Sequence, residues 1–394
     1  MMASGRVRMT PAYPRAGGFF MSRKMTAFVL GVVATVLMAG TAMAGTVKIG
    51  LMCPLTGSWA SEGQDMRNIV LMLAEQTNAQ GGINGDMVEI VVEDDAGDPK
   101  TAALAAQRLS TMGVSAVIGT YGSAITEASQ AIYDEMDIVQ VATGSTAIRL
   151  TEKGLPLFFR TCPRDDEQGR VAAAVLKEKG YKKIAILHDN TSYAKGLAEE
   201  TLTLLKSAGT EVVFYDALTP NERDYSAILT KLKAAGPDAI FFTGYYPEAG
   251  MLLRQKQEMK WDVPMMGGDA TNNLDLVKIA GKSAAGFLFI SPPTLQDLPD
   301  KQAKDFAAAY KARYGTMPAS VWSVLAGDAF IALKAAITGA GSTDPQDIAA
   351  YMKKDLKDLP GLTGSLSFNE KGDRVGDLYR LYRVDENGNF VLQP

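Results

Sequence analysis

Residues 88–119 read VEIVVEDDAGDPKTAALAAQRLSTMGVSAVIG and contain the unit from which the fold is built. The apolar, β-branched run 88–93 predicts a strand, and the short run 116–119 predicts a second one. Between them, Asp98 can cap a helix over residues 100–112, and Pro99 fits the first helical position, where no N–H donor is needed. Strand, helix and strand in this order predict a βαβ unit of a parallel sheet.

The same alternation extends from this unit in two series. The first series has strands at 47–52, 88–93, 116–119 and 138–142, with helices at 65–78, 100–112 and 125–135. After 158–163 (FFRTCP) the pattern begins again, with strands at 184–188, 211–215, 239–243 and 264–267 and helices at 168–179, 193–207, 225–234 and 248–260. We therefore predict an α/β fold with two doubly wound parallel-sheet lobes.

The C-terminal part breaks the alternation. A strand at 286–293 runs into Pro292-Pro293, three helices follow at 301–314, 321–338 and 345–354, and a final hairpin (378–384 and 390–392) surrounds the turn dipeptide Asn387-Gly388. We expect the helices to complete the first lobe and the hairpin to complete the second. The predicted lobes are residues 45–162 with 292–371, and 163–291 with 372–394. Several crossings would form a hinge beside a cleft, which suits a ligand trap.

The N-terminus has the parts of a secretory signal. Arg23 and Lys24 precede an apolar run at 27–38, and Ala42-Met43-Ala44 forms an A-x-A site. The run is too short to span a bilayer as a helix, so we expect cleavage after residue 44 and a soluble periplasmic protein. All 44 acidic residues and 35 of the 40 basic ones lie after residue 44, a net charge of −9, which makes nucleic acid an unexpected partner.

Reactive groups are scarce. His188 is the sole histidine, and the chain has no G-x-S-x-G elbow, no phosphate-binding G-x-x-x-x-G-K-[ST] loop and no G-x-G-x-x-G after the first strand. The glycine-rich segment 81–85 precedes a strand and predicts a turn. Asp94, Asp95 and Asp98 are expected to cap and solvate a loop, a phospho-acceptor or cation site being the alternative. We predict no enzyme activity, no cofactor and no metal.

Polar residues follow several strands, where open α/β sheets bind ligands. Ser123, with Gly122 before it, follows one strand, and Gly144-Ser145-Thr146 follows the next, so hydroxyls and free N–H groups could hold a carboxylate there. In the second series Tyr193, Tyr245 and Asp269 occupy equivalent loops, and an acid among aromatic faces suits an ammonium group. Helix capping and packing are the alternative explanations. Together the loops predict a site for a zwitterion.

These features resemble the periplasmic leucine/isoleucine/valine-binding proteins, the type I solute-binding family of ABC importers. The resemblance covers residues 45–394 and is carried by these segments: VKIG at 47–50, PLTG at 54–57, GGING at 81–85, DDAGDP at 94–99, VIG at 117–119, IAILHD at 184–189 and GYYPE at 244–248. It implies that Ser123 and the turn Gly144-Ser145-Thr146 hold the carboxylate of an amino acid, and that Asp269, with Tyr193 and Tyr245, holds the ammonium. It also implies a monomer that delivers its ligand to a membrane permease with ATPase subunits.

The sequence departs from the family pattern in three places. The turn is Gly-Ser-Thr where Ala-Ala-Thr is usual, Asp269 stands where Glu is usual, and the loop 58–63 carries Trp59 and Glu62. The expected ligand is a branched-chain or similar amino acid, with a smaller, polar or cationic one as alternatives. A receptor for another small molecule, such as an amide, urea or aromatic acid, serving transport or chemosensing, and an enzyme on the same scaffold are the competing functions.

Cys53 and Cys162 are the only cysteines. An oxidising compartment would permit them to form a disulfide, and two separate buried thiols are the alternative.

Overall fold

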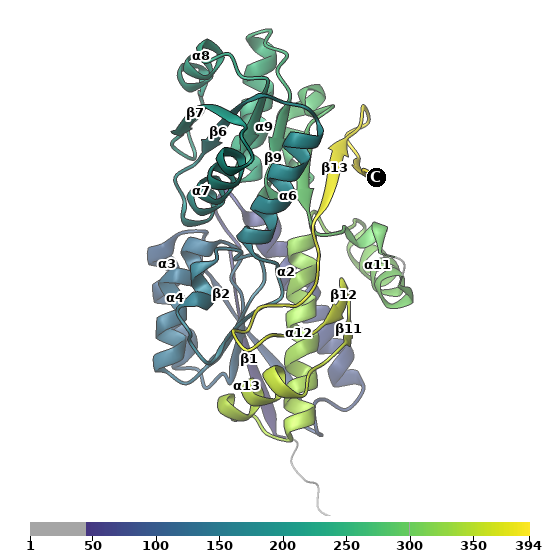
Figure 1. Ribbon diagram of the computed structural model, residues 1–394. Coiled ribbons are helices and arrows are strands. Elements are labelled where there is room, and N and C mark those ends of the chain that lie inside the picture. Colours follow the sequence, from purple (N-terminus) through teal and green to yellow (C-terminus); the bar gives the residue numbers. More distant parts are fainter. Residues whose placement is uncertain (1–44, 299) are drawn as a thin grey trace, which may run out of the picture. The chain divides into compact units, whose positions relative to one another are not determined.

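The computed structural model describes residues 45–298 and 300–394, and the predicted secretory signal at 1–44 lies outside the described residues. Two parallel-sheet lobes, each covered by helices, form the described part of the chain, so the predicted fold class is confirmed (Figure 1).

The first sheet has five parallel strands in the order β2-β1-β3-β4-β5. Its strands are β1 (Thr46–Cys53), β2 (Met87–Asp94), β3 (Ala116–Ile118), β4 (Val139–Ala142) and β5 (Phe158–Arg160). Its connecting helices are α2 (Ala60–Ala79), α3 (Pro99–Ser110), α4 (Ser123–Glu135) and the short α5 (Arg149–Glu152). The predicted cap of α3 is confirmed, because Asp98 accepts a hydrogen bond from the Thr101 backbone N–H at 2.9 Å.

The second sheet has seven strands in the order β14-β13-β10-β9-β8-β6-β7. They are β6 (Lys183–His188), β7 (Glu211–Ala217), β8 (Ala239–Phe242), β9 (Met265–Gly267), β10 (Leu288–Ser291), β13 (Arg380–Val384) and β14 (Phe390–Leu392). Its helices are α6 (Asp165–Glu178), α7 (Ser192–Ser207), α8 (Ser226–Ala234), α9 (Tyr246–Glu258) and α10 (Asp275–Ala280), with 3-10 turns η1 (Asp269–Thr271) and η2 (Gly281–Ala284). The predicted C-terminal hairpin is confirmed, since β13 pairs antiparallel with both β14 and β10.

Within the described residues the chain passes between the sheets after β5, after β10 and again before β13. The middle return carries η3 (Leu295–Asp297), α11 (Lys301–Tyr314), α12 (Val321–Ala340), α13 (Pro345–Lys354) and the small hairpin β11 (Leu359–Gly361) and β12 (Gly364–Leu366). Helix α12 is long and apolar enough to cross a membrane, but 78% of its most apolar window is buried because it packs against α2 as the core helix of the first lobe.

Some element boundaries differ from the prediction. Helix α4 begins at Ser123, two residues before the predicted start, because Gly122 adopts an extended conformation and takes the N-cap position. The short elements α5, α10, β5, β11 and β12 were not predicted, since three to six residues carry too little periodicity to be detected.

Candidate functional site

The loops after β3 and β4 form one side of the candidate site. Ser123 is fully buried at the first position of α4, and its hydroxyl accepts a hydrogen bond from the backbone N–H of Ala147 at 3.2 Å, which joins the two loops. The Ser123 hydroxyl proton remains free to be donated. Thr146 is also fully buried. These positions fit a carboxylate site of hydroxyls and backbone N–H groups near a helix N-terminus.

Ser145, also predicted for this site, uses its hydroxyl elsewhere. Its Oγ lies 2.7 Å from the hydroxyl of Thr126 on α4 and 3.2 Å from the carbonyl oxygen of Thr120. The Ser145 side chain is therefore bonded inside the first lobe.

Gly144 is required by its neighbour Tyr121. A Cβ at residue 144 would lie 2.7 Å from Cδ2 of Tyr121 and 2.8 Å from the Tyr121 carbonyl oxygen, closer than real Cβ atoms approach. The turn therefore has Gly where Ala is usual in the resembling family, because the Tyr121 ring occupies the space.

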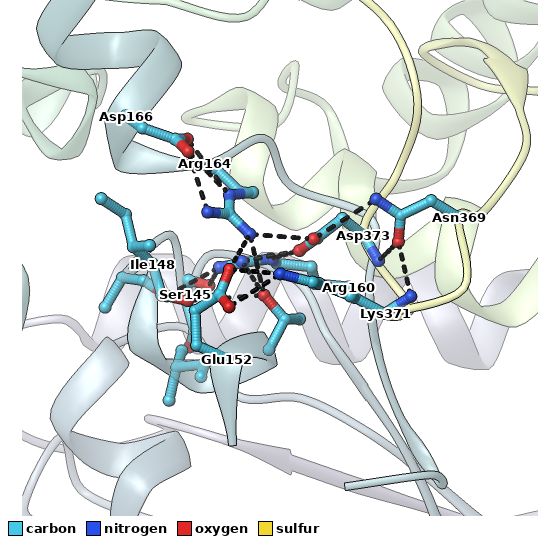
Figure 2. Close-up of polar contacts among 12 residues, drawn as sticks. Ser145, Ile148, Glu152, Arg160, Arg164, Asp166, Asn369, Lys371 and Asp373 are labelled. Carbon is cyan, nitrogen blue, oxygen red and sulfur yellow. Dashed lines mark hydrogen bonds and ion pairs between the residues drawn. The ribbon is translucent and has the colours of Figure 1, made fainter. Parts of the chain in front are cut away.

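The buried Arg160 side chain binds the backbone of the turn that contains Ser145 (Figure 2). Arg160, fully buried at the end of β5, donates from Nη1 to the carbonyl oxygens of Ser145 at 3.1 Å and Ala147 at 2.9 Å. Its guanidinium also pairs with Asp373 at 2.6 Å, and Arg164 reaches the other oxygen of Asp373 at 3.1 Å. Burial alone would raise the pKa of Asp373, but the two guanidinium groups hold it below its ordinary value. We call Arg160, Arg164 and Asp373 the hinge cluster.

Asp269 forms the opposite side of the site. It begins η1 directly after β9, its side chain is buried, and it accepts a hydrogen bond from the Tyr379 hydroxyl at 2.7 Å. Its backbone N–H donates to Gln168 at 2.8 Å, and the Tyr193 hydroxyl donates to the same Gln168 oxygen at 3.3 Å. Burial raises the pKa of Asp269 to about 7, although the bond from Tyr379 lowers it. Among the described residues, no Lys or Arg forms an ion pair with Asp269.

An aromatic cluster joins the two sides. Trp59 of the first lobe packs against Tyr245 of the second, with ring centroids 4.2 Å apart and the ring planes tilted by 33°. Tyr245 also packs edge-on against Tyr121 and Tyr193, at 5.7 and 5.4 Å. The Trp59 ring fits only because the adjoining positions are Gly97 and Gly122, where a Cβ would lie 2.8 and 2.9 Å from it.

Glu62 bridges the lobes rather than lying free in the site. It is fully buried in the first turn of α2, and it accepts hydrogen bonds from the Asn273 amide and from the Ser320 hydroxyl, both at 2.6 Å. Burial raises the pKa of Glu62 to about 8 against the lowering effect of these two bonds. Asn273 follows η1 in the second lobe, so this contact spans the interface.

Both rims of the interface are also bonded. On one rim the Tyr246 hydroxyl donates to the Ser58 carbonyl oxygen at 2.9 Å and lies 3.1 Å from the Ser61 hydroxyl. On the other, the Ser192 hydroxyl donates to Glu127 at 2.8 Å. The site is therefore enclosed between lobes that touch on both edges.

Sequence reasoning missed Tyr121, Gln168, Asn273 and Tyr379. Tyr121 directly precedes the predicted Gly122-Ser123, so inspecting one further residue of that loop would have found it. Tyr379 reaches Asp269 from the third crossing and Gln168 from the first turn of α6, and no local pattern signals such an approach.

The predicted disulfide is wrong for this structure, in which Cys53 and Cys162 are both buried free thiols. Cys53 ends β1 and Cys162 follows β5, and β3 and β4 lie between these strands. Three strand spacings amount to ~14 Å, whereas the Cα atoms of bonded cysteines are at most ~7 Å apart.

Two other groups have structural roles. Asp94 accepts hydrogen bonds from the backbone N–H groups of Leu55 and Ala96, both at 2.8 Å, and so closes a loop, as Asp98 caps α3. His188 accepts from the Asn190 backbone N–H at 3.0 Å and packs against Tyr215. Neither arrangement presents a nucleophile with its base.

Comparison with known proteins identifies similar proteins along nearly the whole described chain. The periplasmic binding protein family model matches residues 46–389. A Leu/Ile/Val-binding protein of Rhizobium johnstonii is 34% identical over 346 residues, which cover 88% of this chain and 93% of that protein. A leucine-, isoleucine-, valine-, threonine- and alanine-binding protein of Pseudomonas aeruginosa is 34% identical over 331 residues, covering 84% and 87%.

Solved structures of binding proteins have the same fold as this chain. A leucine-binding protein of Thermotoga maritima superposes with a TM-score of 0.82 at 28% identity, covering 88% of this chain and 98% of that one. A branched-chain amino acid transporter substrate-binding protein of Streptococcus pneumoniae, in complex with isoleucine, has a TM-score of 0.81 at 30% identity, covering 88% and 100%.

Proposed function

The chain belongs to the periplasmic binding protein family, and from that premise we propose that it binds an amino acid between its lobes and delivers it to the permease and ATPase subunits of an ABC importer. The family consists of extracytoplasmic binding proteins and not of enzymes. Residues 1–44 then act as a cleaved leader to the periplasm, and the protein acts as a monomer.

One observation carries the proposal: Asp269 is a buried carboxyl group without a cationic partner among the described residues, on the opposite side of the interface from Ser123 and Thr146. Asp165 is a second buried carboxyl, and burial and then the charge of Asp269 raise its pKa. A buried carboxylate is costly unless it is paired. An α-ammonium group supplies the missing positive charge, while the α-carboxylate meets hydroxyls and N–H groups at the start of α4.

The binding mechanism follows from which lobe supplies each group. We assign residues 45–162 and 292–371 to one lobe, which supplies Ser123, Thr146 and Trp59, and residues 163–291 and 372–394 to the other, which supplies Tyr193, Tyr245 and Asp269. A ligand that contacts both lobes stabilises the closed form by its differential affinity for the two states.

Calorimetry with wild-type protein tests the function. We expect at least one of leucine, isoleucine, valine, threonine and alanine to bind, and the matched compounds lacking either the ammonium or the carboxylate to bind at least tenfold more weakly. Small-angle scattering should show a smaller radius of gyration with ligand. If no L-amino acid binds, the proposed ligand class is wrong and a receptor for another small molecule becomes the better hypothesis.

A further inference from the structure

Apart from the Thr146 hydroxyl, which is assigned to the α-carboxylate, two buried hydrogen-bond donors in the candidate site lack a partner among the described residues. The hydroxyl of Tyr121 and the indole N–H of Trp322 make no hydrogen bond, although the two residues are only 2% and 1% exposed. Buried polar groups in native proteins are nearly always bonded, so an unpaired one requires an explanation. The rings of Tyr121 and Trp322 pack with their centroids 6.3 Å apart, so one explanation should account for both unpaired groups.

Both side chains belong to the site. Tyr121 directly precedes Gly122-Ser123, and its ring packs against Trp59 and Tyr245 of the aromatic cluster as well as against Trp322. Trp322 lies in the first turn of α12, two residues after Ser320, which donates to Glu62. The two unpaired donors therefore come from the loop before α4 and from the first turn of α12, and Glu62 lies near both, since its charge raises the pKa of Tyr121 after burial and it accepts from Ser320.

We infer that the bound amino acid has a neutral side chain with a hydrogen-bond acceptor, a hydroxyl or a carboxamide, which the Tyr121 hydroxyl and the Trp322 indole N–H recognise. This inference rests on the proposed function. An indole N–H can only donate. Burial, and after it the charge of Glu62, raises the pKa of Tyr121, so its hydroxyl stays protonated and able to donate.

The buried acids and the unpaired donors make the other classes of side chain less favourable. A side-chain carboxylate would add a further buried acid to a site in which burial already raises the pKa values of Glu62, Asp165 and Asp269, and a carboxylate is costly to bury without a cationic partner. A cationic side chain would find no acceptor in the Trp322 indole and only the phenolic oxygen of Tyr121, while both oxygens of Glu62 already accept bonds from Asn273 and Ser320. A branched aliphatic side chain would fit the aromatic faces but would leave both donors unpaired, which costs affinity.

Isosteric ligand pairs test the inference. Threonine and valine differ by a hydroxyl in place of a methyl group, and asparagine and leucine differ by a carboxamide in place of an isopropyl group. Calorimetry with wild-type protein should show the polar member of at least one pair binding about tenfold more tightly, since a site built to bond a polar group discriminates against the analogue that lacks it.

Two variants that keep an aromatic ring but remove the donor locate the effect. Tyr121→Phe and Trp322→Phe should each reduce the preference for the polar member at least threefold, whatever their effect on the affinity for both members. Tyr133→Phe, another buried tyrosine of the first lobe, and Trp261→Phe, a tryptophan of the second lobe away from the site, are the controls and should leave the preference unchanged. Because the preference is a ratio within one protein, a general loss of stability does not mimic the result.

Equal or tighter binding of valine and leucine by the wild-type protein would overturn the inference and leave the proposed function standing. A polar preference that survives both variants would also overturn it, because another group would then recognise the side chain. If no amino acid binds at all, the proposed function fails, and this inference fails with it.

Discussion

The hinge cluster and the candidate site both bury charged side chains close to the chain crossings, but they compensate those charges differently. In the hinge cluster, Asp373 lies between the guanidinium groups of Arg160 and Arg164, which hold its pKa below the ordinary value. In the site, Glu62 and Asp269 have only neutral partners, and burial raises their pKa values to about 8 and about 7. The charges of the hinge cluster are thus compensated without a ligand, whereas the acids of the site have no positively charged partner among the described residues.

The largest expected effect comes from breaking the hinge cluster. Asp373→Asn leaves Arg160 buried without its counter-charge, and we expect the free energy of unfolding to fall by about 3–5 kcal/mol, as for other buried pairs that lose one partner. Urea unfolding followed by circular dichroism measures this. The control is Glu167→Gln, which breaks the exposed pair with Arg170 and should cost less than ~0.5 kcal/mol. A loss below ~1 kcal/mol for Asp373→Asn would contradict the assigned role of the cluster.

Asp269→Asn should weaken ligand binding without reducing the stability of the protein. Ligand affinity should fall by about 1.5–3 kcal/mol, the contribution of a charged hydrogen bond. The ligand-free protein should be at least as stable as wild type, because the substitution removes a buried carboxyl without a cationic partner. Calorimetry and urea unfolding give the two values, and Asp216→Asn, at an exposed position on β7, is the control. Unchanged affinity would remove Asp269 from the ammonium site.

Glu62 should make stability depend on pH. Burial raises its pKa from the ordinary 4.5 to about 8 in the folded protein, so between these values the folded state holds a proton that the unfolded state releases. Its contribution to stability is therefore full below pH 4.5 and is lost as the pH rises towards 8.

Glu62→Gln tests this directly, because glutamine does not titrate. The free energy of unfolding of wild type relative to Glu62→Gln should fall between pH 5 and pH 8.5 by an amount on the order of 2 kcal/mol. Asp95 and Asp269, whose pKa values are also raised, are present in both proteins and cancel in the difference. A difference that does not vary with pH would mean that Glu62 is accessible to water.

The smallest expected effect concerns the rim. Tyr246→Phe removes a hydroxyl that bonds only across the interface, to Ser58 and Ser61, so it should weaken ligand binding by about 0.5–1.5 kcal/mol through a less stable closed form. Tyr314→Phe is the control, since the Tyr314 hydroxyl bonds to Asn68 inside the first lobe and its loss should leave the affinity unchanged. Equal effects of the two variants in calorimetry would argue against closure as the cause.

Much of the fold could be predicted because its signals are local. Asp98 and Pro99 mark the start of a helix, and Asn387-Gly388 marks a hairpin, so each element is identified from a few neighbouring residues. Residues that follow strands were identified for the same reason, and Ser123, Thr146, Tyr193, Tyr245 and Asp269 are all buried in the structure.

The parts that could not be predicted depend on the order of strands and on the crossings. Whether two cysteines can meet depends on how many strands lie between β1 and β5, which the chain order does not reveal. Arg160 and Asp373 are 213 positions apart, and they meet only because the third crossing passes beside the end of β5. The role of Ser145 depended on the rotation of its side chain towards Thr126, which no sequence pattern records.

The late position of α12, β13 and β14 in the chain has a consequence for biogenesis. Helix α12 covers α2 of the first lobe, and β13 covers the edge of β10 in the second, so neither lobe can be finished from an N-terminal fragment. Non-local pairings of this kind slow folding and expose apolar surface while they are incomplete. In a nascent or truncated chain that ends before residue 380, β10 would be an open edge strand with unpaired N–H and C=O groups. Such a chain is prone to aggregation and degradation. Both cores are buried only when α12, β13 and β14 are present. Partial products therefore differ from the finished protein in their exposed apolar surface and open strand edge.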